Sequence, residues 1–530
     1  MCEVGVSDVE HDVEHEVEHE VEHEVEHEVE HEVEHEVEFT GCGRMSAKDF
    51  PIVLSKAMAL CMRLYDTLAR ETKEITPING ETYGFYCCGP TVYGPAHIGN
   101  FRTFVVQDVF RRALELGGTP TKHVRNLTDV DDKTIRDSQA VGQTLKQFTS
   151  HWTEKFHLDC EALNCLLPAI EPSAVDHIPQ QVVMIEELIE KEHAYAAADG
   201  SVYFRISSYP DYGKLSHLDE RELDLGKTQN QRANDSDEYE KDSVADFVLW
   251  KSRRDEDGDN FWQSPWGEGR PGWHLECSAM IREYLGESFD LHSGGEDLVF
   301  PHHENEIAQS KCSCGGDFAA HWFHITHLLV EGKKMSKSLG NFFRLDDLIE
   351  KGAKPNELRL ALIGGHYRKQ LNFTLDSLHA ASEALDKLLK AERALAMLAG
   401  ADVAPSYEDL IGLEDKGLFE NAWIGLNDDL NTQRAIGAVF GALRRSQNEP
   451  EPQTQWKGLH FMLQALGIKL PEIVEEVQED VPAEMKALAA QRWDARSNKQ
   501  WAKSDELRDQ LKDLGWLVKD GSDGYSLEKI

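Results

Sequence analysis

Cysteine, histidine and glutamate side chains occur in the sequence at positions that could form a metal site. His302 and Glu306 are four residues apart, so on a helix they share one face and could bind one ion together. Cys277 lies near the start of another predicted helix, and Cys88 ends an aromatic run typical of a strand. Two thiolates, an imidazole and a carboxylate satisfy tetrahedral zinc in number and type. A helix-capping histidine with ordinary buried thiols remains the alternative.

A second polar segment could meet a nucleotide. His97-Ile-Gly-Asn100 follows the predicted strand Tyr83–Cys88, and apolar residues recur at helical spacing from Phe101 to Phe110. In a parallel α/β sheet this loop lies at the carboxyl end of the strand, where helix N-terminal amides face a phosphate. Cys87 is expected to point to the opposite face of the strand from Cys88, into the core.

A loop with three lysines could bind a polyphosphate. It reads Glu331-Gly-Lys-Lys-Met-Ser-Lys-Ser-Leu-Gly-Asn341, and Lys334 and Lys337 could neutralise charge that develops on leaving pyrophosphate. A generic basic surface loop is the alternative when this segment is considered alone.

Three aspartates follow the next predicted strand, at residues 122–127. Asp129, Asp131 and Asp132 would lie beside the first loop, at the carboxyl edge of the same sheet. They could form part of a site or cap the following helix, and the sequence leaves both open.

Composition sets further limits. A chain of 530 residues predicts two to four domains, and its ten cysteines are too sparse for a disulfide scaffold, which favours reduced thiols in the cytoplasm. No apolar run is long enough to cross a bilayer, so no membrane role is expected. The net charge of −41 is uneven, because residues 1–38 contain 17 acidic residues and no Lys or Arg. From Val481 onward, nine basic residues balance nine acidic ones. Only local patches therefore bear on nucleic-acid binding.

Taken together, the motifs resemble class I aminoacyl-tRNA synthetases. Lys334-Met-Ser-Lys-Ser338 matches a signature of that class, and His97-Ile-Gly-Asn100 is similar to its His-Ile-Gly-His partner, with Asn100 in place of the usual final histidine. Four more segments narrow the resemblance to the cysteinyl-tRNA synthetase family: Cys-Gly-Pro-Thr-Val-Tyr (88–93), Arg-Asn-Leu-Thr-Asp-Val-Asp-Asp-Lys (125–133), Gly-Trp-His-Leu-Glu-Cys-Ser-Ala-Met (272–280) and Phe-Pro-His-His-Glu-Asn-Glu-Ile-Ala-Gln (300–309). The resemblance extends from about residue 62 to the C-terminus.

The resemblance implies a two-step reaction. L-Cysteine would react with ATP, accompanied by Mg²⁺, to give cysteinyl-adenylate and pyrophosphate, and the acyl group would then pass to the 3′ end of tRNA(Cys). One Zn²⁺ would bind the substrate thiol as thiolate, which serine cannot imitate. The residues implied are Cys88, Cys277, His302 and Glu306 for the metal; His97, Gly99, Asn100, Lys334 and Lys337 for ATP, with His97, Asn100, Lys334 and Lys337 catalytic; and Gly89, Thr128, Trp273 and Asp297 for cysteine.

The same resemblance implies an α/β fold with a Rossmann-like parallel-sheet catalytic domain. The predicted segments are a disordered low-complexity extension of Val-Glu-His-Glu repeats at 1–61, the first catalytic half at 62–170, an inserted connective domain at 171–262, the second half with the lysine-rich loop at 263–354, a helical bundle at 355–470 and a C-terminal anticodon-binding module at 481–530.

Basic residues recur in that last module. Arg492, Arg496, Lys499 and Lys503 have the spacing of one helix face, and Trp493 and Trp501 are close in sequence. A basic stripe beside aromatic rings suits phosphate contact and base stacking in tRNA. A solvated amphipathic helix with tryptophans in a small core is the alternative.

Three other functions remain possible at this point. A related cysteine ligase acting on a small amino-sugar acceptor would share the metal and nucleotide motifs but should lack the C-terminal extension. A generic nucleotidyltransferase would lack the Cys-Cys-His-Glu set, and a non-enzymatic zinc or RNA-binding protein would not need both lysines of the loop. A monomer is expected, although sequence does not determine the oligomeric state.

Overall fold

The structure is a computed structural model that describes residues 61–218, 246–335, 339–470, 481–520 and 524–529. All of them belong to the compact unit Ala59–Ile530. The predicted extension, apart from Cys61, and Lys337 of the lysine-rich loop lie outside the described residues.

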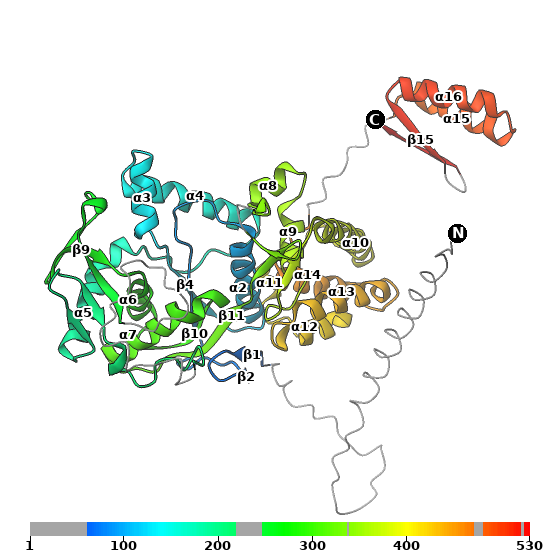
Figure 1. The fold of residues 1–530 in the computed structure, drawn as a ribbon. Helices are drawn as coiled ribbons and strands as arrows, with labels where there is room; N and C mark the ends of the chain where they lie inside the picture. Colours follow the sequence, from blue (N-terminus) through cyan, green and yellow to red (C-terminus); the bar gives the residue numbers. More distant parts are fainter. Residues whose placement is uncertain (1–60, 219–245, 336–338, 471–480, 521–523, 530) are drawn as a thin grey trace, which may run out of the picture. The chain divides into compact units, whose positions relative to one another are not determined.

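A four-stranded sheet carries the segments that were predicted to form the site. Its strand order is β11-β10-β3-β4, and all neighbouring strands are parallel. Figure 1 shows α2 on one side of these strands and α6 and α7 on the other, which is the layering of an α/β fold. The predicted fold class is thereby confirmed. The strands are β3 (Tyr83–Cys87), β4 (Thr121–Arg125), β10 (Ser288–Gly295) and β11 (Phe318–Ile325).

Strand β3 sends alternate side chains into two different cores. Phe85 and Cys87 join the cluster that also contains residues of α2 (Ile98–Leu116), whereas Tyr86 and Cys88 join the cluster on the opposite face. This alternation is the period of two that a strand imposes. The prediction that Cys87 and Cys88 point to opposite faces is confirmed.

The inserted region forms an antiparallel sheet of its own, in the order β5-β6-β7-β9-β8. One of its strands, β9 (Gly267–Pro271), is rich in glycine and pairs with β7. Its glycines permit close approach: a Cβ on Gly269 would lie 2.2 Å from the carbonyl oxygen of Lys251. This sheet therefore continues beyond residue 262. Its other strands are β5 (Ala194–Ala196), β6 (Val202–Phe204), β7 (Phe247–Ser252) and β8 (Trp262–Ser264).

Helices and two small sheets complete the chain up to Phe373. The helices are α3 (Asp132–Ala140), α4 (Leu145–Ala162), α5 (Ile178–Glu190), α6 (Trp273–Leu285), α7 (Glu304–Cys314), α8 (Leu345–Glu350) and α9 (Pro355–Leu362). The small sheets contain β1 (Arg63–Asp66) with β2 (Glu71–Glu74), and β12 (Leu328–Val330) with β13 (Lys333–Lys334) and β14 (Leu371–Phe373).

The helical region predicted after residue 355 packs onto the core that contains α2. Arg359 of α9 is fully buried; its Nε donates to the Leu466 carbonyl at 2.9 Å and its Nη2 to Asp108 of α2 at 2.5 Å. This arginine therefore joins the helical region to the parallel-sheet part. The helices beyond it are α10 (Leu375–Ala399), α11 (Tyr407–Leu410), α12 (Glu420–Asn427), α13 (Thr432–Ser446) and α14 (Pro452–Leu466).

The last module consists of α15 (Ala483–Ser497), α16 (Trp501–Asp513), β15 (Trp516–Asp520) and β16 (Tyr525–Lys529), with its own small apolar core. The prediction that four basic residues share one helix face is wrong. The helix ends before Lys499, which has a positive φ of 57°, Lys503 lies on the next helix, and Arg492 is buried. The spacing of the four residues spans the break between α15 and α16, so the helical period of 3.6 residues does not relate them to one face.

Candidate metal centre and active site

The four residues predicted to bind a metal lie together. The ligand atoms of Cys88, Cys277, His302 and Glu306 are all within 4.8 Å of one another. The two sulfurs are 4.0 Å apart, and Glu306 Oε1 is 3.9 Å from Cys88 Sγ and 2.9 Å from His302 Nε2. Metal–ligand bonds of about 2.0–2.3 Å would bring such atoms roughly 3.3–3.8 Å apart, so a tetrahedral ion fits after small side-chain shifts.

Separate segments of the chain deliver these residues to one point. Cys88 follows β3 at the carboxyl edge of the sheet, Cys277 lies near the start of α6, and His302 and Glu306 share one face across the turn Val299–His303 and the start of α7. All four residues are buried. Desolvated thiols, an imidazole and a carboxylate with a common centre form a donor set for a soft divalent cation.

The charges in this cluster support one another. Burial opposes ionisation of Glu306, yet His292 and His302 lower its pKa to about 2. Burial likewise disfavours the cationic form of His302, but Glu306 and Cys277 raise its pKa to about 10. Burial acts to raise the pKa of Cys277, while hydrogen bonds with Cys88 and His302 lower it to about 6. At neutral pH Glu306 and Cys277 are therefore ionised, whereas burial raises the pKa of Cys88 and keeps it a thiol. A bound cation would displace the protons of Cys88 and His302.

Neighbouring rings orient His302. Its Nδ1 lies 3.0 Å from Nδ1 of His274, which leaves Nε2 directed at Glu306. The ring of Trp273 stacks on it with centroids 4.3 Å apart. Such contacts fix the tautomer and orientation of a ligating histidine.

Two histidines that the sequence reasoning missed lie beside these residues. His303 Nε2 is 3.3 Å from Cys88 Sγ, and His292 Nε2 is 2.8 Å from Glu306 Oε2, so both could join Cys88 and Glu306 around an ion. The adjacent histidines His302 and His303 are visible in the sequence, but only His302 lies four residues before Glu306, so the helix-spacing argument selected it alone. His292 lies on β10, and no local spacing connects it to the other donors.

The turn before α2 is a capping box. The Asn100 backbone N–H donates to His97 Nδ1 at 3.2 Å, and the His97 backbone N–H donates to Asn100 Oδ1 at 3.1 Å. Burial lowers the pKa of His97, so its imidazole is neutral. Since Nδ1 accepts a hydrogen bond, the proton is on Nε2, which can donate to a ligand. The amide of Asn100 thus has a structural use at this position.

The lysine-rich loop meets this turn. A Cβ on Gly99 would lie 2.8 Å from Cε of Met335, and the Ile98 N–H donates to the Phe343 carbonyl at 3.0 Å. Met335 follows directly on exposed Lys334 in β13. The two segments that were predicted to bind ATP are therefore in direct contact.

The four residues predicted to line the cysteine pocket differ in their surroundings. Gly89 donates its N–H to Asn126 Oδ1 at 2.7 Å and has no room for a Cβ. Thr128 is buried and donates to Glu276 at 3.0 Å. Burial raises the pKa of Glu276 well above its usual range. Trp273 packs on His302, and Asp297 is exposed after β10.

Comparison with known proteins identifies the family. Residues 74–383 match the catalytic-domain model of class I (C) tRNA synthetases, and residues 478–525 match the cysteinyl-tRNA ligase anticodon-binding domain. A cysteine–tRNA ligase of Opitutus terrae is 51% identical over 88% of this chain and 99% of its own. The chain belongs to the cysteine–tRNA ligase family. Another member, from Chlamydia trachomatis serovar A, is 42% identical over 88% of this chain and 99% of its own.

The fold agrees with this family. A methionyl-tRNA synthetase of Mycobacterium tuberculosis bound by methionyl-adenylate has a TM-score of 0.50 and 14% identity, covering 72% of this chain and 89% of that chain. None of the helices in the described segments combines the length and apolar character of a membrane span.

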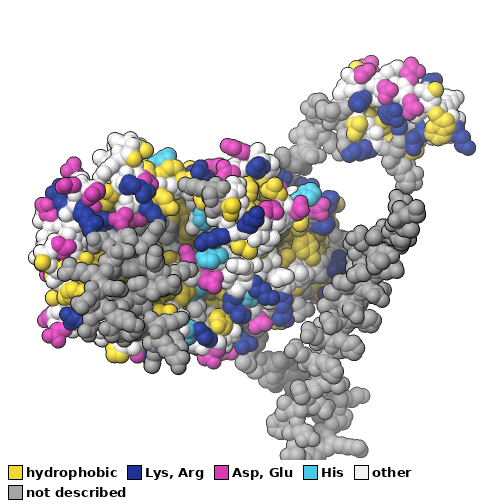
Figure 2. Space-filling view, viewed as in Figure 1, with side chains coloured by type: hydrophobic (Ala, Val, Ile, Leu, Met, Phe, Trp, Pro, Cys, Tyr) yellow, Lys and Arg dark blue, Asp and Glu magenta, His cyan; other side chains and the backbone are white. Residues whose placement is uncertain are grey.

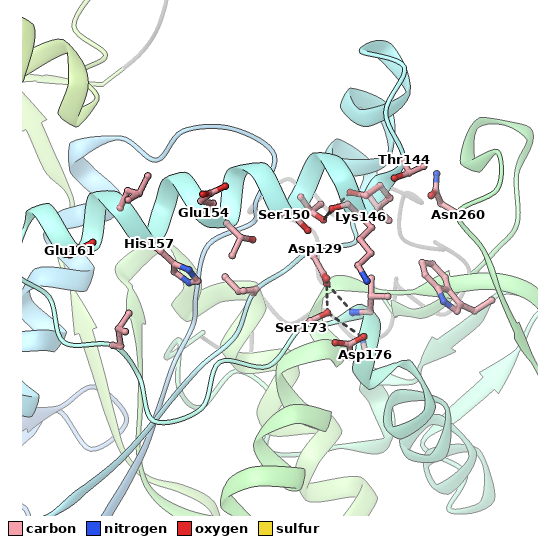
Figure 3. A pocket seen from close by; sticks show the side chains of 18 of the residues that line it. Asp129, Thr144, Lys146, Ser150, Glu154, His157, Glu161, Ser173, Asp176 and Asn260 are labelled. Atoms are coloured by element: carbon pink, nitrogen blue, oxygen red, sulfur yellow. Dashed lines mark hydrogen bonds between the residues drawn. The ribbon is translucent and has the colours of Figure 1, made fainter.

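Two of the three aspartates that were left open make structural contacts in this cysteine–tRNA ligase family member. Asp131 caps α3 by accepting from the Thr134 N–H at 2.6 Å. Asp129 accepts from the Ser173 hydroxyl at 2.6 Å and the Val175 N–H at 3.0 Å, as Figure 3 shows. The capping alternative therefore holds for Asp131, and Asp129 holds the segment from Ser173 to Val175 through hydrogen bonds.

Proposed function

We propose that this chain ligates L-cysteine to tRNA(Cys) in two steps, with ATP as the source of activation. The observation that carries the proposal is the Cys-Cys-His-Glu cluster at the same sheet edge as the His97 turn, in a chain of the cysteine–tRNA ligase family. The segment from Cys88 to Asn100 begins in the Cys-Cys-His-Glu cluster and ends in the His97 turn, so the carboxylate of a bound amino acid would lie between the two sites.

Cys88, Cys277, His302 and Glu306 would hold Zn²⁺, because their donor atoms match its preferred ligands and share one buried centre. When bound, zinc supplies an open coordination position that takes the substrate thiol as thiolate. Trp273 and Thr128 would close the pocket around the substrate, and Asp297 would contact its ammonium group. A site that requires a thiolate rejects serine by about 10⁴-fold or more.

Residues at the start of α2 would bind the ATP phosphates. The Nε2–H of neutral His97 donates a hydrogen bond, and the helix N-terminus presents backbone amides to the anion. Lys334, with Lys337 outside the described residues, would neutralise the charge that develops on pyrophosphate, and Mg²⁺ would accompany ATP. Gly99 and Asn100 keep the turn closed. Catalysis is mainly positioning and charge stabilisation.

The C-terminal module would contact the tRNA anticodon. Arg496, Lys499 and Lys503 are exposed and remain candidates, although they do not form one stripe. Figure 2 shows basic and acidic side chains interspersed on the viewed face of this module. Each basic side chain would therefore contact the tRNA singly rather than as part of a continuous basic patch. Arg492 is buried and is better explained by support of the module. The match to an anticodon-binding domain also disfavours the alternative of a small amino-sugar acceptor.

The decisive experiment is ATP–pyrophosphate exchange with the full chain. Exchange should require L-cysteine, fall by about 10⁴-fold with L-serine and disappear with a zinc chelator. Absence of cysteine-dependent exchange would overturn the proposal.

The tRNA step is tested separately by charge reversal. The double variant Arg496→Glu and Lys499→Glu should lose charging of tRNA(Cys) while exchange persists. Loss of both activities would show that these residues act on the fold rather than on tRNA.

A further inference from the structure

We propose that Cys160 and Cys165 form an oxidation site, in which a hydroperoxide oxidises Cys165 and Cys160 then closes a disulfide within the folded chain. The pair lies at the end of α4, outside the metal cluster and the nucleotide-binding turn. The proposal does not depend on the proposed function.

The end of α4 has the geometry that brings these two side chains together. Asn164 has a positive φ of 55°, its N–H donates to the Glu161 carbonyl at 2.9 Å, and the Cys165 N–H donates to the Cys160 carbonyl at 2.9 Å. This is the Schellman motif, in which the side chain just beyond the helix contacts the one on its last turn. Both positions are cysteines here, so the motif places the two thiols on neighbouring positions. A disulfide could form without unwinding the helix.

Guanidinium groups lie next to both sulfurs. Arg359 Nη1 is 3.8 Å from Cys165 Sγ, and Arg125 Nη1 is 4.0 Å from Cys160 Sγ. The interaction with Cys160 lowers the pKa of Cys165; burial and Asp108 oppose this shift, and the charges of Arg359 and Arg125 add to it. The same interaction raises the pKa of Cys160, with burial adding to it. Cys165 is therefore the nucleophile and Cys160 the thiol that reacts second.

The two cysteines differ in exposure. Cys165 is half-buried and lines a cavity of about 1120 Å³, whereas Cys160 is 1% exposed. His157 and Glu161, from the same end of α4, also line this cavity, and Figure 3 shows the ring of His157 extending from the helix. A small hydroperoxide can enter such a space, and its first contact would be with Cys165.

The reaction balances with a hydroperoxide as oxidant. The Cys165 thiolate attacks one peroxide oxygen, the O–O bond breaks, and the leaving oxygen takes a proton to become an alcohol or water. Cys165 is then a sulfenic acid. The Cys160 sulfur attacks it, an S–S bond forms, and the hydroxyl leaves as water with the proton of Cys160.

Oxidation would alter the contacts of Arg359. This side chain also donates to the Leu163 carbonyl at 2.8 Å and to Asp108, and it reaches the end of α14 through Leu466. A disulfide removes the thiol beside it. The oxidation site thus lies at the joint between the parallel-sheet part and the helical region.

Peptide mass spectrometry tests the proposal on the full chain. Trypsin releases residues 156–191 as one peptide, in which Cys160 and Cys165 are the only cysteines. Stoichiometric hydrogen peroxide should cause this peptide to lose two hydrogens and resist alkylation until it is reduced. Recovery of two free thiols, or of sulfinic acid at Cys165 without a disulfide, would overturn the proposal.

Two variants and one internal control assign the roles. Cys160→Ser should stop the reaction at a Cys165 sulfenic acid that dimedone traps, and Cys165→Ser should leave Cys160 reduced. Cys61 is also half-buried, but burial raises its pKa, whereas the pKa of Cys165 is lowered, so at pH 7 Cys165 should be alkylated faster than Cys61. Equal or faster labelling of Cys61 in the wild-type chain would count against the proposal even if a variant failed to fold.

Discussion

The thiols of Cys88 and Cys277 and those of Cys160 and Cys165 form two pairs with opposite surroundings. The first pair has a carboxylate and imidazoles as neighbours, with Glu306 Oε1 3.9 Å from Cys88 Sγ. The second has two guanidinium groups within 4.0 Å of its sulfurs. Anionic and neutral donors attract a metal cation, whereas fixed guanidinium charges repel it and stabilise a thiolate. The neighbours, rather than the proximity of two cysteines, determine the chemistry.

The largest expected difference between the pairs is in activity. Cys277→Ser should abolish zinc retention and lower cysteine-dependent exchange by about 10³-fold or more, because the substrate thiol loses its binding partner. Cys165→Ser is the matched control and should retain both zinc and exchange. Zinc content by mass spectrometry and exchange rates check this. Equal losses in both variants would remove the distinction between the two pairs.

Charge removal beside the second pair should reduce stability strongly. Asp108 is buried, and although burial opposes its ionisation, Arg112 and Arg359 lower its pKa to about 2. Asp108→Asn should cost roughly 3–5 kcal/mol in urea unfolding, because two buried guanidinium groups lose their partner. Zinc content should not change.

The pH dependence of the same carboxylate gives a separate check. Because its folded pKa of about 2 lies below the ordinary value of 3.8, the stabilisation is complete above that value and is lost as pH falls through about 2. Wild type should therefore lose about 2 kcal/mol more than Asp108→Asn between pH 4.5 and 2. Parallel curves for the two proteins would contradict the assignment.

A smaller effect is expected from the rings around the first pair. His274→Ala removes the contact that orients His302 and should weaken zinc binding by about 10- to 100-fold, measured by chelator competition. Thiol labelling of Cys165 should not change. An unaltered zinc affinity would mean that packing of Trp273 alone orients His302.

The smallest effect concerns the stability of the reduced second pair. Cys165→Ser replaces a half-buried sulfur by a hydroxyl of similar size, so its unfolding free energy should change by less than about 1 kcal/mol. Urea unfolding under reducing conditions measures this. A larger loss of unfolding free energy would show that Cys165 serves mainly to stabilise the fold.

The sequence alone predicted the parallel α/β class, the Cys88 to Asn100 segment and the four residues that the fold brings together as a possible metal site. It did so because strand period, helix spacing and motif composition are local properties of the chain. It failed for the basic stripe, since a break after Ser497 interrupts the helical period.

Only the tertiary structure revealed His292 and His303 beside the metal cluster, the contact of Met335 with Gly99, and Arg359 beside Cys165. Each joins residues from separate elements, and their separation along the chain carries no period that would connect them. A side chain's pKa depends on the charges and solvent around it, and folding alone brings those neighbours together. The sequence thus supplied the reactive groups, and the fold determined which of them act on one another.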